Sequence, residues 1–217
     1  MSRFITLEGP EGSGKTTQFR LLHVHLEARG IPVLATREPG GTPIGEQVRA
    51  ILHDPCHTAM LPPTEVLLYL ASRAQLVGQV IRPALANGMV VISDRYVEST
   101  LAYQGYGRGL DLEVLQRITE FATGGLRSDL VIYLDLPVEV GLQRKMLAYE
   151  REQAEWTRMD QQAFEFHERV RRGYLAMAEA EPGRWCVIDA QQPVDVVQAE
   201  IRRRVEGLLA GVGEVRP

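Results

Sequence analysis

Residues 9–16, with the sequence GPEGSGKT, combine glycines, a lysine and a threonine in an arrangement that suits phosphate binding. Gly9, Gly14, Lys15 and Thr16 occupy the fixed positions of the pattern G-x-x-x-x-G-K-[S/T]. The glycines let successive backbone N–H groups point at one phosphate, and the following helix adds partial positive charge from its N-terminus. We expect Lys15 to reach the outer phosphates of a nucleotide and the Thr16 hydroxyl to ligate Mg2+.

The whole loop is therefore a candidate ATP site. Its residues are Gly9, Pro10, Glu11, Gly12, Ser13, Gly14, Lys15, Thr16 and Thr17. An ordinary glycine-rich turn is the alternative, but the complete pattern lies directly after an apolar run and before a helical one, which disfavours that reading. Nucleotide binding alone does not distinguish hydrolysis, phosphoryl transfer and switching, so the other charged residues must decide the activity.

Charged side chains follow two apolar runs that we expect to be buried strands. Asp94 and Arg95 come after one run, and Asp135 comes after another. Ligands of open parallel sheets bind at the carboxyl ends of the strands, so these residues should face a ligand. Asp94 is our candidate for holding Mg2+ together with Thr16 and for supporting catalysis. Asp135 is either a second such acid or the N-cap of a helix.

Arginines recur where a second anion could bind. Arg37 and Arg95 each follow a predicted strand, whereas Arg49 and Arg73 lie on predicted helices that can face the same crevice. Guanidinium groups suit phosphate because they donate two parallel hydrogen bonds. A solvated surface arginine is the common alternative at any one position, but two arginines at the ends of two strands favour an anion site.

Three further arginines, Arg144, Arg151 and Arg158, recur every seven residues. If this segment is helical, they lie on one face and form a mobile cationic lid over about residues 144–160. A solvated helix face balanced by glutamates is the alternative. The phosphate loop contains no arginine, so charge that develops during phosphoryl transfer needs a cation from elsewhere. We take Arg151 as the candidate catalytic residue of the lid.

Apolar runs alternate with helical patterns along the chain and predict the scaffold. The expected strands lie at 4–7, 31–36, 89–94, 128–137 and 185–190, and the most regular helices at 16–28 and 64–86. The last two strands lack the polar alternation of a half-exposed strand, which predicts burial on both faces. Strands that alternate with helices predict a parallel sheet covered on both sides, in an α/β three-layer sandwich of about five strands. We expect one domain, 1–217.

Composition limits the partners. The 217 residues carry a formal net charge of -4, which disfavours binding to nucleic acid through many phosphate contacts. Two cysteines and the lack of a long apolar run or secretory signal predict a cytoplasmic protein without a membrane partner. The sequence HDPCH, from His53 to His57, resembles a small metal cluster, but it lacks a second ligand pair, and we interpret it as a loop.

Six segments, in order, resemble those of the thymidylate kinase family. They are EGPEGSGKTTQ from Glu8, REPGGTPIGEQVR from Arg37, LLYLASRAQ from Leu67, DRYVESTLAYQGYGRG from Asp94, DLVIYLDLPVEVGL from Asp129 and FHERVRRGYLAMA from Phe166. The chain is similar to the bacterial type, in which the loop carries an acid, here Glu11, and the lid supplies the arginine. The resemblance implies a P-loop NTPase-like fold, a homodimer, and an enzyme that phosphorylates dTMP to dTDP with ATP and Mg2+, a step in dTTP biosynthesis.

The resemblance also implies roles for individual residues. Tyr69 would stack on thymine and Arg73 would lie near a base carbonyl, while Tyr103 would press on the sugar and favour deoxyribose. Glu11 would accept from the 3'-hydroxyl, and Arg37 and Arg95 would grip the acceptor phosphate. The full set of implied substrate residues is Glu11, Arg37, Tyr69, Arg73, Arg95, Ser99, Thr100, Tyr103 and Gln104, of which Thr100 and Gln104 face the pyrimidine edge.

Two departures from the family pattern leave alternatives open. Tyr69 stands where Phe is common, and the lid segment differs from the shorter, glycine-containing form, so the choice among Arg144, Arg151 and Arg158 stays open. A kinase acting on CMP or dGMP is the nearest rival, and the segment STLAYQG weighs against it. A non-catalytic nucleotide switch is a rival from another class, and the acceptor-side arginines weigh against it.

Overall fold

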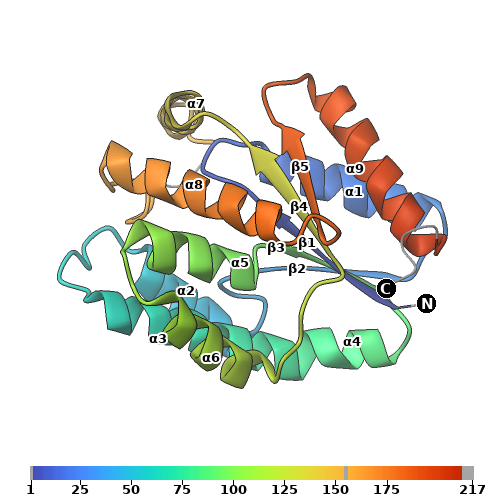
Figure 1. The fold of residues 1–217 in the computed structure, drawn as a ribbon, viewed down its shortest axis with the longest axis horizontal. Helices are drawn as coiled ribbons and strands as arrows, with labels where there is room; N and C mark the ends of the chain where they lie inside the picture. Colours follow the sequence, from blue (N-terminus) through green and yellow to red (C-terminus); the bar gives the residue numbers. More distant parts are fainter. Residues whose placement is uncertain (1, 154–155, 212–217) are drawn as a thin grey trace.

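A computed structural model describes residues 2–153 and 156–211, and within them a five-stranded sheet runs through the middle of the molecule (Figure 1). The strands are β1 (Arg3–Glu8), β2 (Val33–Arg37), β3 (Val90–Asp94), β4 (Leu130–Asp135) and β5 (Trp185–Asp189), in the order β2-β3-β1-β4-β5. Every neighbouring pair is parallel. The predicted three-layer α/β fold is therefore confirmed, with each expected strand close to its predicted position.

Helices connect the strands and cover both faces of the sheet. They are α1 (Lys15–Ala28), α2 (Pro43–His53), α3 (Pro62–Leu76), α4 (Arg82–Ala86), α5 (Val97–Thr100), α6 (Leu112–Thr123), α7 (Val138–Glu150), α8 (Phe164–Ala180) and α9 (Val194–Leu209), with π-helical segments η1 (Val77–Ile81) and η2 (Leu101–Gly107). Residues 154 and 155 of the predicted lid, and residues 1 and 212–217 of the expected domain, lie outside the described part of the chain.

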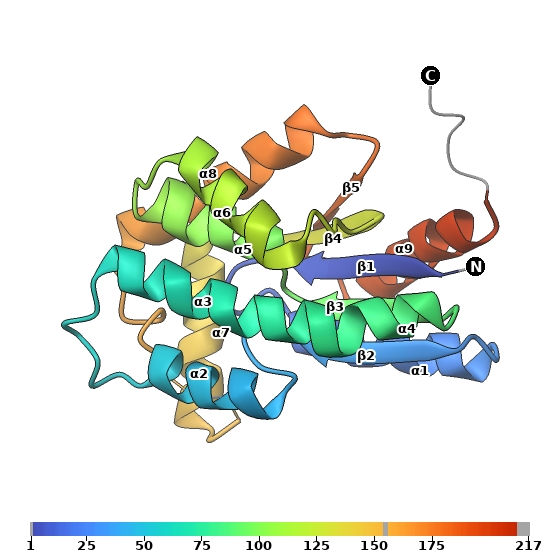
Figure 2. The same ribbon diagram turned by 90° about the horizontal axis from the view of Figure 1, so that it is seen from below.

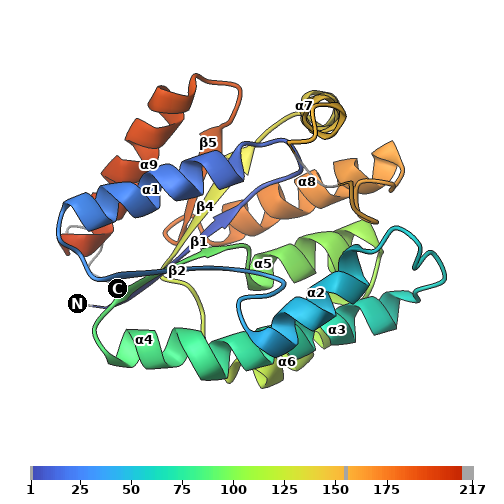
Figure 3. The ribbon, with the colours of Figure 1, turned by 180° about the vertical axis from the view of Figure 1, so that it is seen from behind.

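Two layers of helices enclose the sheet, as Figures 1 and 3 show from opposite sides. On one face, Leu22 and Leu26 of α1 and Ile201 of α9 pack against Ile5 and Ile132 of the sheet. On the other face, α3, η1 and α4 pack against β1 and β3, and α8 packs against β4. The even and odd residues of the central strands therefore both enter a core, which explains why these strands read as continuous apolar runs.

Local signals explain where several helices begin and end. Thr42 precedes α2 and its Oγ1 accepts from the Gly45 N–H at 3.0 Å, while Pro43 starts the helix where no donor is needed. Asp111 caps α6 in the same way, and Gly124 ends that helix in the left-handed conformation. The helical run predicted at 64–86 is continuous from α3 through η1 to α4, but its middle is π-helical.

The prediction that the fifth strand is buried on both faces is wrong. Val187 is 48% exposed, whereas Cys186 and Ile188 are buried against the helix layer of α1 and α9. β5 is the edge strand of the sheet, and on its other face α8 covers only Trp185. An apolar run at a sheet edge can therefore look like a central strand in sequence while one of its faces is open.

The parallel register brings the charged residues at the ends of the strands to one edge of the sheet. Asp94 is aligned with Leu7 on one side and with Arg37 on the other. The strands β1, β2 and β3 end together, facing α2, α3 and α8 in Figure 2. Among the described residues, every helix is too short or too polar to cross a lipid bilayer.

Candidate active site

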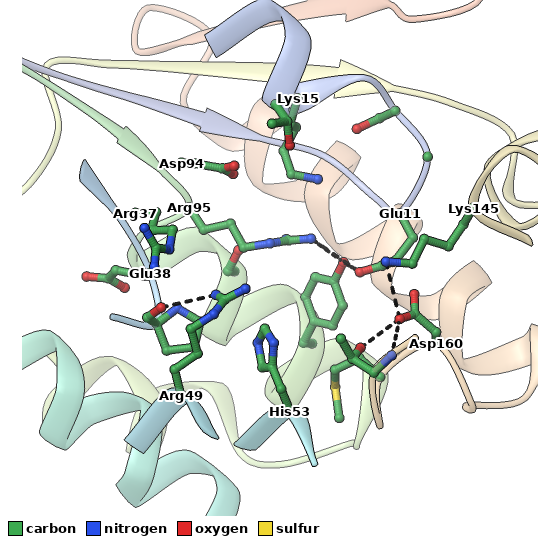
Figure 4. A pocket seen from close by; sticks show the side chains of 18 of the residues that line it. Glu11, Lys15, Arg37, Glu38, Arg49, His53, Asp94, Arg95, Lys145 and Asp160 are labelled. Atoms are coloured by element: carbon green, nitrogen blue, oxygen red, sulfur yellow. Dashed lines mark hydrogen bonds and ion pairs between the residues drawn. The ribbon is translucent and has the colours of Figure 1, made fainter. Parts of the chain in front are cut away.

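A cavity of about 740 Å3 opens at this carboxyl edge of the sheet. Figure 4 shows Lys15 reaching into it from the start of α1 and Arg95 from the turn after β3, with Arg49 and His53 on the far side of Arg95 from Lys15. Most of the residues predicted from sequence line it. They are Glu11, Gly12, Ser13, Gly14, Lys15, Thr16, Thr17, Arg37, Arg49, Tyr69, Arg73, Asp94, Arg95, Ser99, Thr100, Tyr103, Gln104 and Arg144.

Lys15 is folded back onto the phosphate loop. Its Nζ donates to the carbonyl oxygens of Gly9 at 2.8 Å and of Pro10 at 3.0 Å, so these two residues contact the lysine and not the cavity. Burial and the nearby charge of Arg95 lower the pKa of Lys15 to about 8, against the opposing effect of Asp94 and Glu11. An anion bound in the cavity would replace these carbonyl contacts with charge-assisted hydrogen bonds to the lysine.

The phosphate loop is packed closely against the start of α7. A Cβ built on Gly141 would lie 2.5 Å from the Glu11 carbonyl oxygen, and one on Gly12 would collide with the Gly141 carbonyl. Gly12 also has a φ of 72°, which side chains rarely tolerate. Glycine at both positions therefore lets the loop backbone contact the helix that carries Arg144 and Lys145.

Arg95 occupies the centre of the cavity and has a φ of 73°, unusual for a residue with a side chain. Its Nη1 donates to Ser99 Oγ at 3.1 Å, and its Nη2 donates to Tyr103 OH and Glu11 Oε1, each at 3.2 Å. The guanidinium carbon also lies 5.0 Å from the centre of the Tyr103 ring. The strained backbone and these contacts aim the guanidinium at the space between the loop and η2.

Glu11 is ionised in this setting. Burial raises the pKa of Glu11, but His167, whose Nδ1 lies 3.7 Å from Oε2, and the charges of Arg95 and Lys15 outweigh that effect and bring it well below its ordinary value. Its Oε1 also accepts from Tyr103 OH at 2.7 Å. The acid therefore balances Arg95 and Lys15 while no nucleotide phosphate is bound.

Glu8, at the end of β1, holds the turn that carries Arg95. Its Oε1 accepts from the Tyr96 N–H at 2.8 Å, and its Oε2 accepts from Ser99 Oγ at 2.7 Å and Tyr174 OH at 2.8 Å. Burial and the neighbouring charge of Glu98 raise the pKa of Glu8 to about 7. Sequence reasoning assigned Glu8 no role, because nothing in its position distinguishes it from any last residue of a strand.

Asp94 and Thr16 both line the cavity and have the chemistry that Mg2+ prefers. Asp94 Oδ1 is buried and has no hydrogen-bond partner, so this oxygen is available to a cation or to its water ligands. Asp135 lies outside the cavity lining and does not cap α7. Its two oxygens accept from Arg171 Nε at 2.8 Å and Nη2 at 2.9 Å, and the N-cap position of α7 is Pro137, with no side-chain cap.

The arginines of the acceptor side are held by different partners. Buried Arg73 donates through Nε to Glu38 at 2.7 Å, through Nη1 to Thr100 at 2.8 Å and through Nη2 to the Tyr96 carbonyl at 2.8 Å. Arg37 donates to both Glu46 oxygens, at 2.9 and 3.0 Å, near the mouth of the cavity. Arg73 is therefore held rigidly in the wall of the cavity, whereas Arg37 forms an exposed ion pair with Glu46.

The two tyrosines assigned to the nucleoside also line the cavity. Tyr103 lies beside Arg95 on η2, and Tyr69 extends from α3. Burial, with the nearby charge of Glu65, raises the pKa of Tyr69 to about 12, so its phenol stays protonated at neutral pH. Both rings thus offer apolar faces and neutral hydroxyl groups to a ligand.

The three arginines of the predicted lid do not share one helical face, so that expectation is wrong. Arg144 lies on α7, lines the cavity and donates to the Ala190 carbonyl at 3.1 Å. Arg151 directly follows the end of α7 and is exposed outside the cavity lining. Arg158 is buried and forms an ion pair with Glu65. α7 ends at Glu150, so Arg151 and Arg158 lie beyond the helix, and their seven-residue spacing does not place them on the face that carries Arg144.

Several lining residues were missed by sequence reasoning. They are Glu38, Pro39, His53, Lys145, Ala148, Gln153, Thr157, Met159 and Asp160. Asp160 accepts from the Thr157 N–H and Oγ1, each at 2.7 Å, and lies 3.5 Å from Lys145 Nζ. Burial and the charge of Arg49 lower the pKa of His53 to about 4, which keeps it neutral. Within HDPCH, Cys56 is exposed and His57 Nδ1 contacts the Ile51 carbonyl at 2.9 Å.

Comparison with known proteins agrees with this geometry. The sequence profile of the family described as thymidylate kinase matches residues 7–201. A thymidylate kinase of Roseiflexus castenholzii is 49% identical over 99% of this chain and 97% of its own length. One from Deinococcus radiodurans is 53% identical over 91% of this chain and 93% of its own. The crystal structure of thymidylate kinase from Ehrlichia chaffeensis superposes with a TM-score of 0.75 at 31% identity, covering 94% of this chain and 98% of that one.

Proposed function

The chain belongs to the thymidylate kinase family and phosphorylates dTMP, and we propose that it passes the γ-phosphoryl group of ATP, held on the phosphate loop, directly to the phosphate of dTMP held at Arg95. One observation carries the proposal. One cavity is lined both by the phosphate loop with Lys15 and by Arg73, Arg95 and Tyr103. Such a cavity accommodates a donor and an acceptor nucleotide placed end to end.

The reaction needs no protein base. The second pKa of a phosphate monoester is about 6, so the dTMP phosphate is already largely dianionic at neutral pH. One of its oxygens attacks the γ-phosphorus of ATP, the bond from that phosphorus to the β-bridging oxygen breaks, and dTDP and ADP result. The obstacle is the repulsion between two anions. Lys15 on the donor side and Arg95 on the acceptor side offset that repulsion with fixed positive charge.

Thr16 and Asp94 are the proposed residues for Mg2+. Support comes from the unpartnered buried Oδ1 of Asp94 and from the Thr16 position at the start of α1. Magnesium is usually bound by one or two protein groups together with substrate phosphates and water, and this donor set fits that habit. When bound, the ion would neutralise phosphate charge. Asp94 thereby supports catalysis by holding the cation on the donor side.

The nucleoside of dTMP is proposed to lie between α3 and η2. Tyr69 supplies a ring face for thymine, and Arg73 and Gln104 supply polar groups for its edge. Tyr103 presses on the sugar, and Glu11 accepts from the 3'-hydroxyl. Ser99 and Thr100 complete this wall by holding arginines, since Ser99 bonds Arg95 and Thr100 bonds Arg73.

We propose that the segment of about residues 144–160 acts as a lid, with Arg151 as its catalytic arginine. Ala148 and Gln153, which flank Arg151, line the cavity, so a local rearrangement would bring this guanidinium to the phosphates. Arg144 lines the cavity already and is the other candidate. Arg158 is not, because it is buried against Glu65. Closure over the phosphates would also exclude water and limit ATP hydrolysis.

A homodimer is the proposed assembly. α6 packs on α3, and this pair carries three exposed apolar side chains, Leu67, Val114 and Phe121, of which Phe121 is 91% exposed (Figure 2). Contiguous exposed apolar patches mark interaction surfaces, and we propose that these side chains belong to one. We also propose that the single domain works in the cytoplasm, where a reducing environment preserves an exposed free thiol such as that of Cys56.

A turnover assay across monophosphates tests the proposed function. The purified protein, with ATP and Mg2+, is offered dTMP, dUMP, dCMP, dGMP and CMP, and ADP release is followed by a coupled assay. We expect dTMP to give the highest kcat/KM. A higher value for CMP or dGMP would assign the site to another nucleotide kinase, and ATP turnover with none of them would favour a nucleotide switch.

A further inference from the structure

Glu65, on α3, is buried beneath the base-binding wall and outside the residues that line the cavity. Its Oε1 accepts from Gln104 Nε2 at 2.7 Å and from Arg108 Nε at 3.3 Å. Its Oε2 accepts from Arg108 Nη2 at 3.0 Å and pairs with Arg158. Burial raises the pKa of Glu65, but the bonds from Arg108 and Gln104 outweigh that effect and bring it below the ordinary value.

The two arginines of this cluster are themselves fixed. Arg108 Nη1 donates to Gln162 Oε1 at 2.7 Å, and Gln162 Nε2 donates to the Arg158 carbonyl at 3.1 Å. Arg158 Nε donates to the Leu52 carbonyl at 3.3 Å. The carboxylate of Glu65 therefore has little freedom, because it is held by Arg108, which directly follows η2, and by Arg158, which is anchored to α2.

A carboxylate only accepts hydrogen bonds, so it determines which end of the Gln104 amide faces it. The amide nitrogen of Gln104 must point to Glu65, and the carbonyl oxygen is the end left for a ligand in the cavity. Arg73, on the same wall, donates through Nε to Glu38, through Nη1 to Thr100 and through Nη2 to the Tyr96 carbonyl, and Nη2 also lies 2.7 Å from Glu38 Oε2. Of its five N–H groups, one on Nη1 remains for a ligand. The wall thus presents an acceptor beside a donor.

Thymine and uracil complement these two groups, because their N3–H can donate to the Gln104 oxygen and their O4 can accept from Arg73. Cytosine reverses this pattern, with N3 as an acceptor beside an amino donor. On the basis of the proposed function, we propose that Glu65 is a positioning residue for base specificity. By fixing the Gln104 amide, it selects a pyrimidine with N3–H and rejects cytosine.

The test compares dTMP and dCMP as substrates of Glu65→Gln. The new amide can turn its own N–H toward Gln104, so the Gln104 amide is free to rotate and to donate to cytosine N3. We expect the ratio of kcat/KM for dTMP over dCMP to fall by about tenfold or more, mainly through KM, while the KM for ATP changes less than about twofold. In a Gln104→Met background, Glu65→Gln should leave the ratio unchanged, because Glu65 acts through that amide.

Glu98→Gln is the matched control, because Glu98 is also buried, pairs with an arginine at 2.6 Å and lies outside the cavity lining. It should lower the thermal midpoint without changing the ratio. If Glu65→Gln does not fold, Glu65→Asp keeps the charge but withdraws the oxygen from Gln104, and the ratio should again fall. An unchanged ratio, or an equal fall in the Gln104→Met background, overturns the inference. A wild-type protein inactive on dTMP would instead overturn the proposed function.

Discussion

Arg95 and Glu11 form an ion pair across the cavity, with Nη2 3.2 Å from Oε1. The guanidinium is held where, in the proposed function, a donor phosphate on the loop approaches an acceptor phosphate. Its backbone is also fixed, because the Arg95 N–H donates to the Leu7 carbonyl at 3.0 Å and its carbonyl accepts from Ser93 Oγ at 2.8 Å. An incoming phosphate therefore meets a preorganised cation that it shares with Glu11.

Replacing Arg95 with alanine should separate binding from transfer. Removal of a well-placed cation typically lowers a rate by about a hundredfold to a thousandfold. We expect Arg95→Ala to lose kcat by at least that factor while it retains ATP binding, measured by a coupled assay and by titration calorimetry. Arg127→Ala, which removes an exposed arginine paired with Glu181, is the control and should keep both properties. Equal loss of ATP binding and turnover in Arg95→Ala would contradict the acceptor-side role.

ATP affinity should depend on pH through Lys15. In the free protein the pKa of Lys15 is lowered to about 8, so the ammonium group is charged below that pH and loses its proton above it. A bound phosphate favours the charged form and raises this pKa, so binding takes up a proton at higher pH. The Kd for ATP should stay flat from about pH 7 to 8 and then rise by up to about tenfold per pH unit.

Titration calorimetry from pH 7 to 9.5 checks this dependence. Lys15→Arg is the matched variant, because its guanidinium keeps its charge across this range. Its ATP affinity, even if weaker, should not vary with pH. A flat profile for the wild-type protein, or the same slope in both proteins, would refute the role given to Lys15.

The contact between the phosphate loop and α7 predicts the effect of a single methyl group. In Gly141→Ala the new Cβ would lie 2.5 Å from the Glu11 carbonyl oxygen, so the loop must move. Such overpacking costs about 1–3 kcal/mol, and here it would displace the loop backbone that we propose binds the ATP phosphates. We expect ATP affinity to fall by about tenfold or more. Gly78→Ala, with no heavy atom near its new Cβ, should bind ATP as the wild type does.

The proposed dimer depends on the exposed apolar residues of α3 and α6. Phe121→Glu places a charge at the most exposed of them, so sedimentation velocity should show a shift from dimer to monomer. Val24→Glu, at an exposed apolar position on α1 across the sheet, should remain dimeric. A monomeric wild-type protein at micromolar concentration would remove the basis of this proposal.

The sequence predicted the scaffold well because its signals are local. The phosphate-loop pattern and the apolar runs depend on residues close together in the chain, and they placed Lys15, Asp94 and Arg95 correctly at the sheet edge. The mistakes concern features that depend on distant parts of the chain. Asp135 is paired by Arg171 of α8, and Arg158 by Glu65 of α3, and no local pattern announces either partner.

The residues that sequence reasoning missed have the same explanation. Glu8, Glu38 and Glu65 are buried acids whose roles come from the arginines and hydroxyl groups that the fold brings to them. The resemblance to a family supplied the candidate substrate residues, but it did not supply the residues that hold them in place. Those are visible only once the hydrogen bonds of the fold are known.

The central claim is that one cavity holds two phosphate groups in line, the donor on the loop and the acceptor at Arg95. A crystal structure with dTMP and a non-hydrolysable ATP analogue tests it most directly. The account predicts the dTMP phosphate within hydrogen-bond distance of Arg95, its thymine beside Tyr69, and the γ-phosphate of the analogue at Lys15, in line with an acceptor oxygen. A dTMP molecule bound outside this cavity, or with its phosphate directed away from Arg95, would contradict the account.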